Sequence, residues 1–181
     1  MVKLLSNEDG EFLYESDVGG LNNQLKFNKL KTDILIPEGD NAGLTLDIQE
    51  LLISGRINAT GEVDFYRFAG KKGEVISAEF NGFDIYPWDE HDVVIGALNL
   101  YRENKDGTWT LVASNHQNFE GFDAFMVGAL LEEDGNYIMQ VFAPDVLCFG
   151  CGDFMSLDLY GFSEFRQGDH HLSIYKIDAK A

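Results

Sequence analysis

The sequence predicts an all-β fold, a jelly-roll-like antiparallel β-sandwich with an N-terminal extension. Segments rich in Val, Ile, Phe and Tyr recur along the chain, whereas helical patterns are scarce. The 19 glycines interrupt these segments at short intervals, and Asp-Gly pairs stand where tight hairpin turns need positive φ angles. Many short strands with turns and no helices between them are typical of a sandwich or jelly roll.

The predicted strands begin after an N-terminal part that is polar, with scattered Leu and Phe. They are residues 25–30, 64–70, 74–80, 93–101, 109–114, 124–131, 136–143, 154–161 and 171–177. Asp106-Gly107 and Asp134-Gly135 are predicted to form hairpin turns between strands. The length of 181 residues allows one sizeable core plus an extension. We therefore expect residues 1–37 to form an N-terminal extension or extra strands, and residues 38–181 to form the sandwich.

The formal net charge of −18 argues against nucleic acid and anionic membrane surfaces as partners, because both attract cationic proteins. Such a charge suits a protein that binds cations; a solvated acidic surface is the alternative. No segment approaches the roughly 20 apolar residues of a membrane span. The start, MVKLLSNEDGEF, lacks the apolar centre of a signal peptide. The chain is then either cytoplasmic or a piece of a longer exported protein, and we favour the second.

Four segments in a fixed order carry a family signal: GRINATGEVDFYRFAGKKGEVISAEF, ALNLYRENKDGTWTLVASN, LLEEDGNYIMQVF and GDHHLSIYKI. Over about residues 38–177, this ordered set resembles the bacterial pre-peptidase C-terminal domain family. The collagen-binding modules of clostridial collagenases look like distant relatives. The resemblance implies a jelly-roll sandwich that is not itself catalytic and that adjoins a catalytic or adhesive domain in an exported protein.

The resemblance also implies calcium where the linker before the sandwich meets its strands. That linker reads EGDN here, which offers Glu38, Asp40 and Asn41 as ligands, with the last two residue types in swapped order relative to the family. Glu62 and Asp64 offer further oxygens from the sandwich, and Ca²⁺ takes six to eight oxygen ligands. We therefore expect one calcium site that joins the linker to the sheet.

Asp64 is the residue that most needs such an ion. With a period of two, it shares a strand face with Tyr66 and Phe68, and a carboxylate beside a core costs several kcal/mol unless it is compensated. The alternatives to calcium are a hydrogen-bonded strand cap or an ion pair with a nearby cation: Arg56, Arg67 or Lys71.

Two stretches, residues 81–92 and 144–168, are longer and more acidic than the resemblance implies. The first is a second possible metal site or a ligand loop, since its carboxylates could hold a metal with His91 and its aromatic rings could stack on a sugar. Its candidate residues are Asp84, Tyr86, Trp88, Asp89, Glu90 and Asp92. The alternative is a solvated loop with Trp88 packed against the body.

The cysteines form a C-x-x-C pair, Cys148 and Cys151. A disulfide or two free thiols fits this pair better than a zinc site, because His170 and His171 have the wrong spacing to complete a finger. We expect these histidines at the surface. Ser114 and His116 are only two residues apart and do not suggest a catalytic pair, and neither G-x-S-x-G nor H-E-x-x-H occurs.

We therefore expect a non-catalytic, calcium-stabilised extracellular module that binds a peptide or polymer, within a secreted hydrolase or a cell-surface adhesin. The alternatives are a carbohydrate-binding module that uses Tyr86, Trp88 and Trp109, or a jelly-roll glycosidase or lyase, which needs only two carboxylates at a set distance. Trp109 is better explained by core or cross-strand packing. We expect a monomeric module with a protein, peptide or polysaccharide partner outside the cell, no nucleic acid and no membrane insertion.

Overall fold

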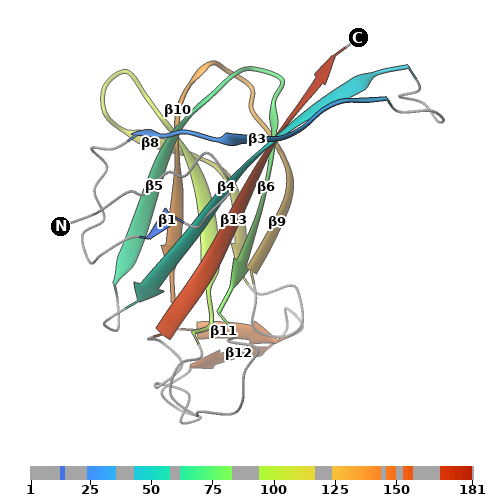
Figure 1. The fold of residues 1–181 in the computed structure, drawn as a ribbon. Helices are drawn as coiled ribbons and strands as arrows, with labels where there is room; N and C mark the ends of the chain where they lie inside the picture. The colour runs from blue at the N-terminus through green and yellow to red at the C-terminus, as the bar shows by residue number, and fades with distance from the viewer. Residues whose placement is uncertain are drawn as a thin grey trace.

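A computed structural model describes residues 13–14, 24–35, 43–57, 62–82, 94–116, 124–143, 146–149, 153–156 and 168–180. All regular structure in these residues is β-strand (Figure 1), so the predicted all-β class is confirmed. The described residues contain no helix with the length and hydropathy that a membrane span requires.

Eight strands form two facing antiparallel sheets. Sheet I has the order β4 (Thr45–Ile57), β13 (Gly168–Lys180), β6 (Val75–Asn81) and β9 (Ala124–Leu130). Sheet II has the order β5 (Val63–Gly70), β10 (Gly135–Phe142), β7 (Ala97–Glu103) and β8 (Trp109–His116). Strands consecutive in sequence mostly lie in different sheets, which is the jelly-roll arrangement. The predicted jelly roll is therefore confirmed.

The core lies between the sheets, where alternate residues of each strand point inward. Phe68, Phe80 and Tyr137 are its largest fully buried side chains. The Phe68 and Tyr137 rings stack with their centroids 6.2 Å apart. Burial of apolar surface of this kind is the main favourable term in folding.

Three strands from the predicted extension pair with the edges of the sandwich. β1 (Leu13–Tyr14) runs parallel to β4, β2 (Gln24–Leu25) runs parallel to β5, and β3 (Asn28–Leu35) runs antiparallel to β4. Between β2 and β3 the ladder is interrupted, and Phe27 packs edge-on against Phe68 at 5.3 Å. The predicted strand 25–30 is therefore divided into two strands. The domain boundary at residue 38 stays a prediction.

The longest strand that sequence patterns missed is β4. Its first six residues are all half-buried and do not alternate between buried and exposed, and its apolar residues change faces between Ile48 and Leu51. Its sequence, TLDIQELLISGRI, therefore lacks the period-two pattern that identifies a strand.

The two predicted hairpin turns have different outcomes. Asp106-Gly107 does join a paired β7–β8 hairpin, and Gly107 has φ +82°. The prediction for Asp134-Gly135 is wrong, because β9 and β10 lie in different sheets and Gly135 is not among the described glycines with positive φ. Asp134 instead accepts a hydrogen bond from the backbone amide of Lys72, 2.8 Å away, in the neighbouring connection between the sheets.

Candidate functional site at the loop end of the sandwich

The long connections all leave the same end of the sandwich, which we call the loop end. The strand registers show this, since Ile57 pairs with Gly168, and Phe142 pairs with both Val63 and Ala97. The connections at this end are residues 58–62, 82–96, 117–123 and 143–167. Short connections at residues 71–74, 104–108 and 131–134 mark the opposite end, the turn end. β11 (Val146–Phe149) and β12 (Asp153–Ser156) form a hairpin beyond the loop end (Figure 1).

The base of the loop formed by residues 83–93 is tightly built. The amide of Val94 donates to the carbonyl of Gly82 at 3.2 Å, which closes the loop at its two ends. A Cβ on Gly82 would lie 1.8 Å from the Val94 carbonyl oxygen, and a Cβ on Gly96 would lie 2.1 Å from the Phe80 ring. Val94 and Ile95 are fully buried. Rigid loop bases of this kind are the usual support for binding residues.

The predicted ligand loop leaves the sandwich from this base. Its candidate residues lie outside the described part of the chain, together with His91: Asp84, Tyr86, Trp88, Asp89, Glu90 and Asp92. Their roles as metal ligands or sugar contacts stay predictions. The predicted strand 93–101 starts late, at Ala97, because residues 94–96 serve as the closing side of the loop base.

Asp64 lies at the loop end of β5 on the core-facing side. It is 4% exposed, and Tyr66 and Phe68 follow it on the same buried row, which confirms the predicted face. Two of the three cations considered as its partners do not fit. Arg67 points to the outer face of sheet II and donates to Glu103 (Nε to Oε2, 3.1 Å), and Lys71 follows β5 at the turn end.

The third cation, Arg56, lies near the loop end on β4. It is exposed and pairs with Asp169, with 2.8 Å between Nη1 and Oδ1. Among the described side chains, no group of three or more His, Cys, Asp or Glu residues is close enough to hold a metal ion. The described residues Glu62 and Asp64 would thus need further ligands from elsewhere in the chain.

The other three predicted calcium ligands come from the segment between β3 and β4. Glu38, Asp40 and Asn41 lie outside the described residues, but Leu35 and Thr45, on either side of their segment, pair with each other. Thr45 begins β4, whereas Asp64 lies beyond the other end of that strand. A strand of this length spans about 40 Å at roughly 3.3 Å per residue. We therefore treat the two acidic groups as separate candidate sites.

The two histidines differ sharply in burial. His171 is exposed, and its Nδ1 lies 3.2 Å from the Ser54 hydroxyl. The expectation that His170 is at the surface is wrong, because it is 1% exposed and stacks on Phe80 at 4.9 Å. Adjacent residues of a strand point to opposite faces, so this pair would not ligate a single ion from one side.

The imidazole of His170 is desolvated. Among the described residues, neither of its ring nitrogens has a hydrogen-bond partner. Burial lowers its pKa from 6.5 to about 4. A Cβ on Gly55 would lie 2.7 Å from its Nε2 and 3.1 Å from the Tyr66 hydroxyl, so these two polar groups converge over Gly55 near the loop end.

Cys148 lies in β11 and pairs in register with Phe154 of β12. Cys151 lies in the connection between these strands, outside the described residues. The predicted disulfide therefore stays a prediction.

The outer face of sheet II carries a cluster of aromatic and amide side chains, which we call the platform. The Trp109 ring lies 5.4 Å from Phe65 and 5.8 Å from Tyr101, which confirms its predicted cross-strand packing. Gln140 Oε1 accepts hydrogen bonds from Asn99 Nδ2 (2.8 Å) and Tyr101 Oη (3.1 Å). The platform residues other than Trp109 were missed, because only the strand order brings them together.

A charged group borders the platform. Glu103 accepts from Arg67 and, at 3.0 Å, from the side-chain amide of Asn136. The hydrogen bond from Arg67 holds the pKa of Glu103 below its ordinary value. Hydrogen bonds among these groups hold their donors and acceptors in fixed positions on the sheet.

Fold and site together define an all-β jelly-roll sandwich with one end devoted to long connections. No protein-family model matches the chain, and no curated protein matches it. Solved structures do resemble it. One is the pre-peptidase C-terminal domain of a collagenase from Bacillus anthracis, with 14% identity, a TM-score of 0.42, and coverage of 69% of this chain and 88% of that chain.

Two further solved structures are similar at the same level. PliG from Aeromonas hydrophila, a periplasmic inhibitor of g-type lysozyme, has 11% identity, a TM-score of 0.39, and coverage of 72% of this chain and 86% of that chain. GEBA250068378 from Sulfurospirillum deleyianum has 11% identity, a TM-score of 0.37, and coverage of 70% and 96%. At these values the similarities assign neither ligand nor activity to this chain.

Proposed function

We propose that this chain is a non-catalytic, calcium-stabilised binding module that works outside the cell, as the accessory domain of a secreted hydrolase or as part of a cell-surface adhesin. Its ligand is a peptide or polymer that contacts the loop formed by residues 83–93. The observation that carries the proposal is the buried carboxylate of Asp64 at the same end as the closed base of that loop.

A bound Ca²⁺ would explain why the carboxylate of Asp64 is buried. Burial of a charged carboxylate is costly unless opposite charge and hydrogen bonds compensate it. Arg67 points away from Asp64 and Lys71 lies at the turn end, and Ca²⁺, which favours carboxylate oxygens, would add positive charge beside Asp64. In the proposal, Glu62 and Asp64 bind the ion together with acids of residues 83–93, and Glu38, Asp40 and Asn41 form a separate site.

The ligand role of the loop follows from its chemistry and its support. Carboxylates beside Tyr86 and Trp88 combine charge with large planar surfaces. The closed base at Gly82 and Val94 fixes where the loop starts and ends. An ion held between this loop and Asp64 would also hold the loop in position for its ligand, which lowers the entropic cost of binding.

The calcium part predicts a metal-dependent melting temperature. Thermal unfolding of the wild type in excess EDTA is compared with unfolding in millimolar Ca²⁺, and we expect about 2.7 kcal/mol of added stability at a hundredfold excess over Kd. Asp64→Asn should lose that response, because it removes the charged oxygen that Ca²⁺ favours as a ligand. Glu132→Gln, at the exposed turn end, should respond like the wild type. Equal melting temperatures of the wild type in EDTA and Ca²⁺ would refute the calcium part.

A second candidate function, carbohydrate binding, is favoured by the platform. Phe65, Tyr101 and Trp109 are half-buried on an open sheet face beside amide side chains, and aromatic and amide groups on one face suit a polar ring with apolar faces. A glycan array followed by calorimetry tests this. Trp109→Ala should weaken any glycan binding at least about tenfold while the strand signal in circular dichroism remains. Unchanged affinity in this variant, or no bound glycan at all, would exclude the platform as a carbohydrate-binding surface.

A further inference from the structure

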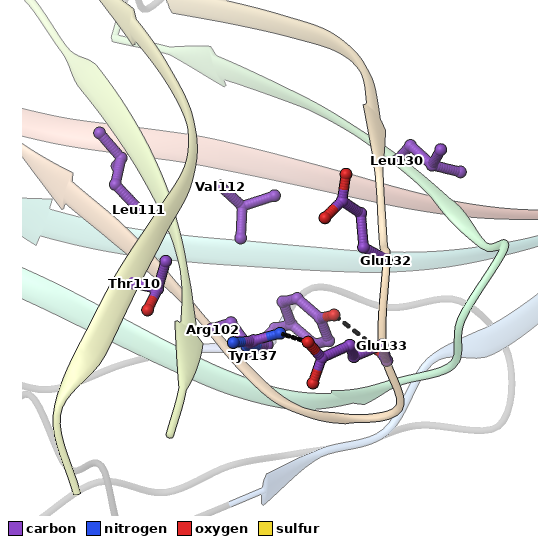
Figure 2. Close-up of a pocket in the computed structure, with 8 residues that line it drawn as sticks. All are labelled: Arg102, Thr110, Leu111, Val112, Leu130, Glu132, Glu133 and Tyr137. Atoms are coloured by element: carbon purple, nitrogen blue, oxygen red, sulfur yellow. Dashed lines mark hydrogen bonds and ion pairs between the residues drawn. The ribbon is translucent and has the colours of Figure 1, made fainter.

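A groove of 360 Å³ lies at the turn end, between the edge strands β8 and β9 (Figure 2). Leu111 on β8 and Leu130 on β9 border it and are 53% and 54% exposed. Figure 2 shows Val112 and Glu132 between β8 and the chain that leaves β9. Exposed apolar side chains gathered in one place on a sandwich edge mark an interaction surface.

The charged residues of the groove are not equivalent. Glu133 forms an ion pair with Arg102, and its carbonyl accepts a 2.7 Å hydrogen bond from the Tyr137 hydroxyl (Figure 2). Glu132 also lines the groove and has no ion-pair partner within the described residues. The groove therefore combines apolar walls with one available negative charge.

A complementary surface lies on the opposite edge of sheet I. Residues 26–35 form what we call the β3 arm. Its start lies against the sandwich, where Phe27 packs on Phe68, and its end projects with the start of β4 (Figure 1). Leu30 and Leu35 on the arm are 52% and 60% exposed. Lys26 and Lys29 are exposed as well, and Lys29 has no ion-pair partner in the part of the chain that the structure describes.

Six large hydrophobic side chains are exposed among the residues whose side chains the structure describes. Leu111, Val112 and Leu130 line the groove. Leu30 and Leu35 lie on the arm, and Val127 lies on β9 outside the groove lining. In the described part of sheet I, β3 has no strand partner on its outer side, whereas β9 borders β8 and its Phe125 carbonyl accepts a 2.6 Å hydrogen bond from the Asn115 side chain. Open edges with apolar side chains favour pairing with another chain.

We propose that the β3 arm of one copy of this chain docks into the β8–β9 groove of a second copy. Leucines of the arm cover the leucines of the groove, and Lys29 lies near Glu132. The two surfaces differ and lie on opposite edges, so a bound pair of copies leaves one arm and one groove open. Such a heterologous contact extends into a row or closes into a ring. This assembly replaces the monomeric state expected from the sequence.

The net charge of −18 opposes contact between two copies, because like charges repel over about a Debye length. The arm overcomes this locally, since it presents lysines to an acidic groove. The same charge would keep copies apart in any orientation that brings two acidic surfaces together. The local complementarity therefore selects one orientation rather than general aggregation.

Sedimentation velocity over a concentration series, in about 0.15 M salt, tests the contact. We expect the wild type to associate as its concentration rises. Lys29→Glu and Glu132→Lys should each weaken association about tenfold, and the double variant, in which the charges are exchanged, should recover most of it. Both residues are exposed, and melting curves check that each variant is folded.

A mixture of the two single variants is the sharpest control. The arm of the Glu132→Lys chain keeps Lys29, and the groove of the Lys29→Glu chain keeps Glu132, so the mixture should associate more strongly than either variant alone. A wild type that stays monomeric at millimolar concentration would overturn the proposal. Equal association of all variants, or a double variant weaker than both single variants, would also overturn it.

Discussion

At the residue scale, His170 shows how burial changes a side chain that sequence alone would place in solvent. Its ring stacks on Phe80, and Gly55 lies so close that an added Cβ would be 2.6 Å from Cε1. Only the neutral imidazole tolerates this environment, because the charged form would lose its hydration without gaining a partner. The low pKa thus reflects the packing around the ring.

This burial makes folding stability depend on pH. The pKa of His170 is about 4 in the folded state and 6.5 ordinarily, so the unfolded chain binds more protons between these values. The contribution of neutral His170 to the free energy of unfolding is then fully present above about pH 6.5. It falls by up to about 3 kcal/mol as the pH drops toward 4. His170→Phe should remove this part of the pH dependence of the free energy of unfolding, as measured by urea unfolding at several pH values.

His171→Phe is the matched control, since His171 is the exposed neighbour on the same strand. Its pH dependence should equal that of the wild type, because carboxylates that titrate in the same range are common to both proteins. Parallel stability curves for the wild type and His170→Phe between pH 4 and 6.5 would contradict the burial argument.

At the element scale, the base of the ligand loop depends on two glycines. Gly82 allows the Val94 carbonyl to approach, and Gly96 allows the Phe80 ring to lie against the backbone. Phe80 also stacks on His170, so one ring connects the loop base to the buried polar group. A substitution at the loop base should therefore also alter the packing of the sandwich core.

Gly96→Ala tests this connection. The new Cβ would lie 2.1 Å from the Phe80 ring, and overpacking of a core typically costs about 1–3 kcal/mol. We expect that loss in denaturant unfolding, together with weaker binding of any ligand of the loop. Gly135→Ala is the control, since nothing lies within 4 Å of its Cβ position and its φ is not positive; it should be close to neutral. Equal stability of both variants would show that the loop base adapts.

At the scale of the whole molecule, the charge of −18 affects every measurement with a cation. Monovalent salt screens the self-repulsion of the folded state and raises stability without any specific site. The calcium measurement therefore needs a sodium chloride series at matched ionic strength. Asp64→Asn should keep the response to sodium chloride and lose the additional response to Ca²⁺.

The jelly roll follows largely from local patterns, because alternation in β5 and β6 and the Asp106-Gly107 turn specify strands and a hairpin. The strand β4 was not predictable, since its first six residues are all half-buried and its apolar residues change faces between Ile48 and Leu51. Likewise Asp134-Gly135 looks like a hairpin in sequence, yet it joins two sheets. Local turn chemistry says where the chain bends but not which strands then pair.

Sequence by itself determined the strand content, the acidic charge, the core-facing row of Asp64, Tyr66 and Phe68, and the acidic aromatic stretch at residues 83–93. Each of these depends on neighbours within a few residues. Tertiary structure alone decided that the long connections share one end, that Thr45 and Asp64 lie at opposite ends of the sandwich, and that His170 is buried. These features depend on the order and register of strands distant in sequence, which pairing between the sheets fixes and local periodicity does not record.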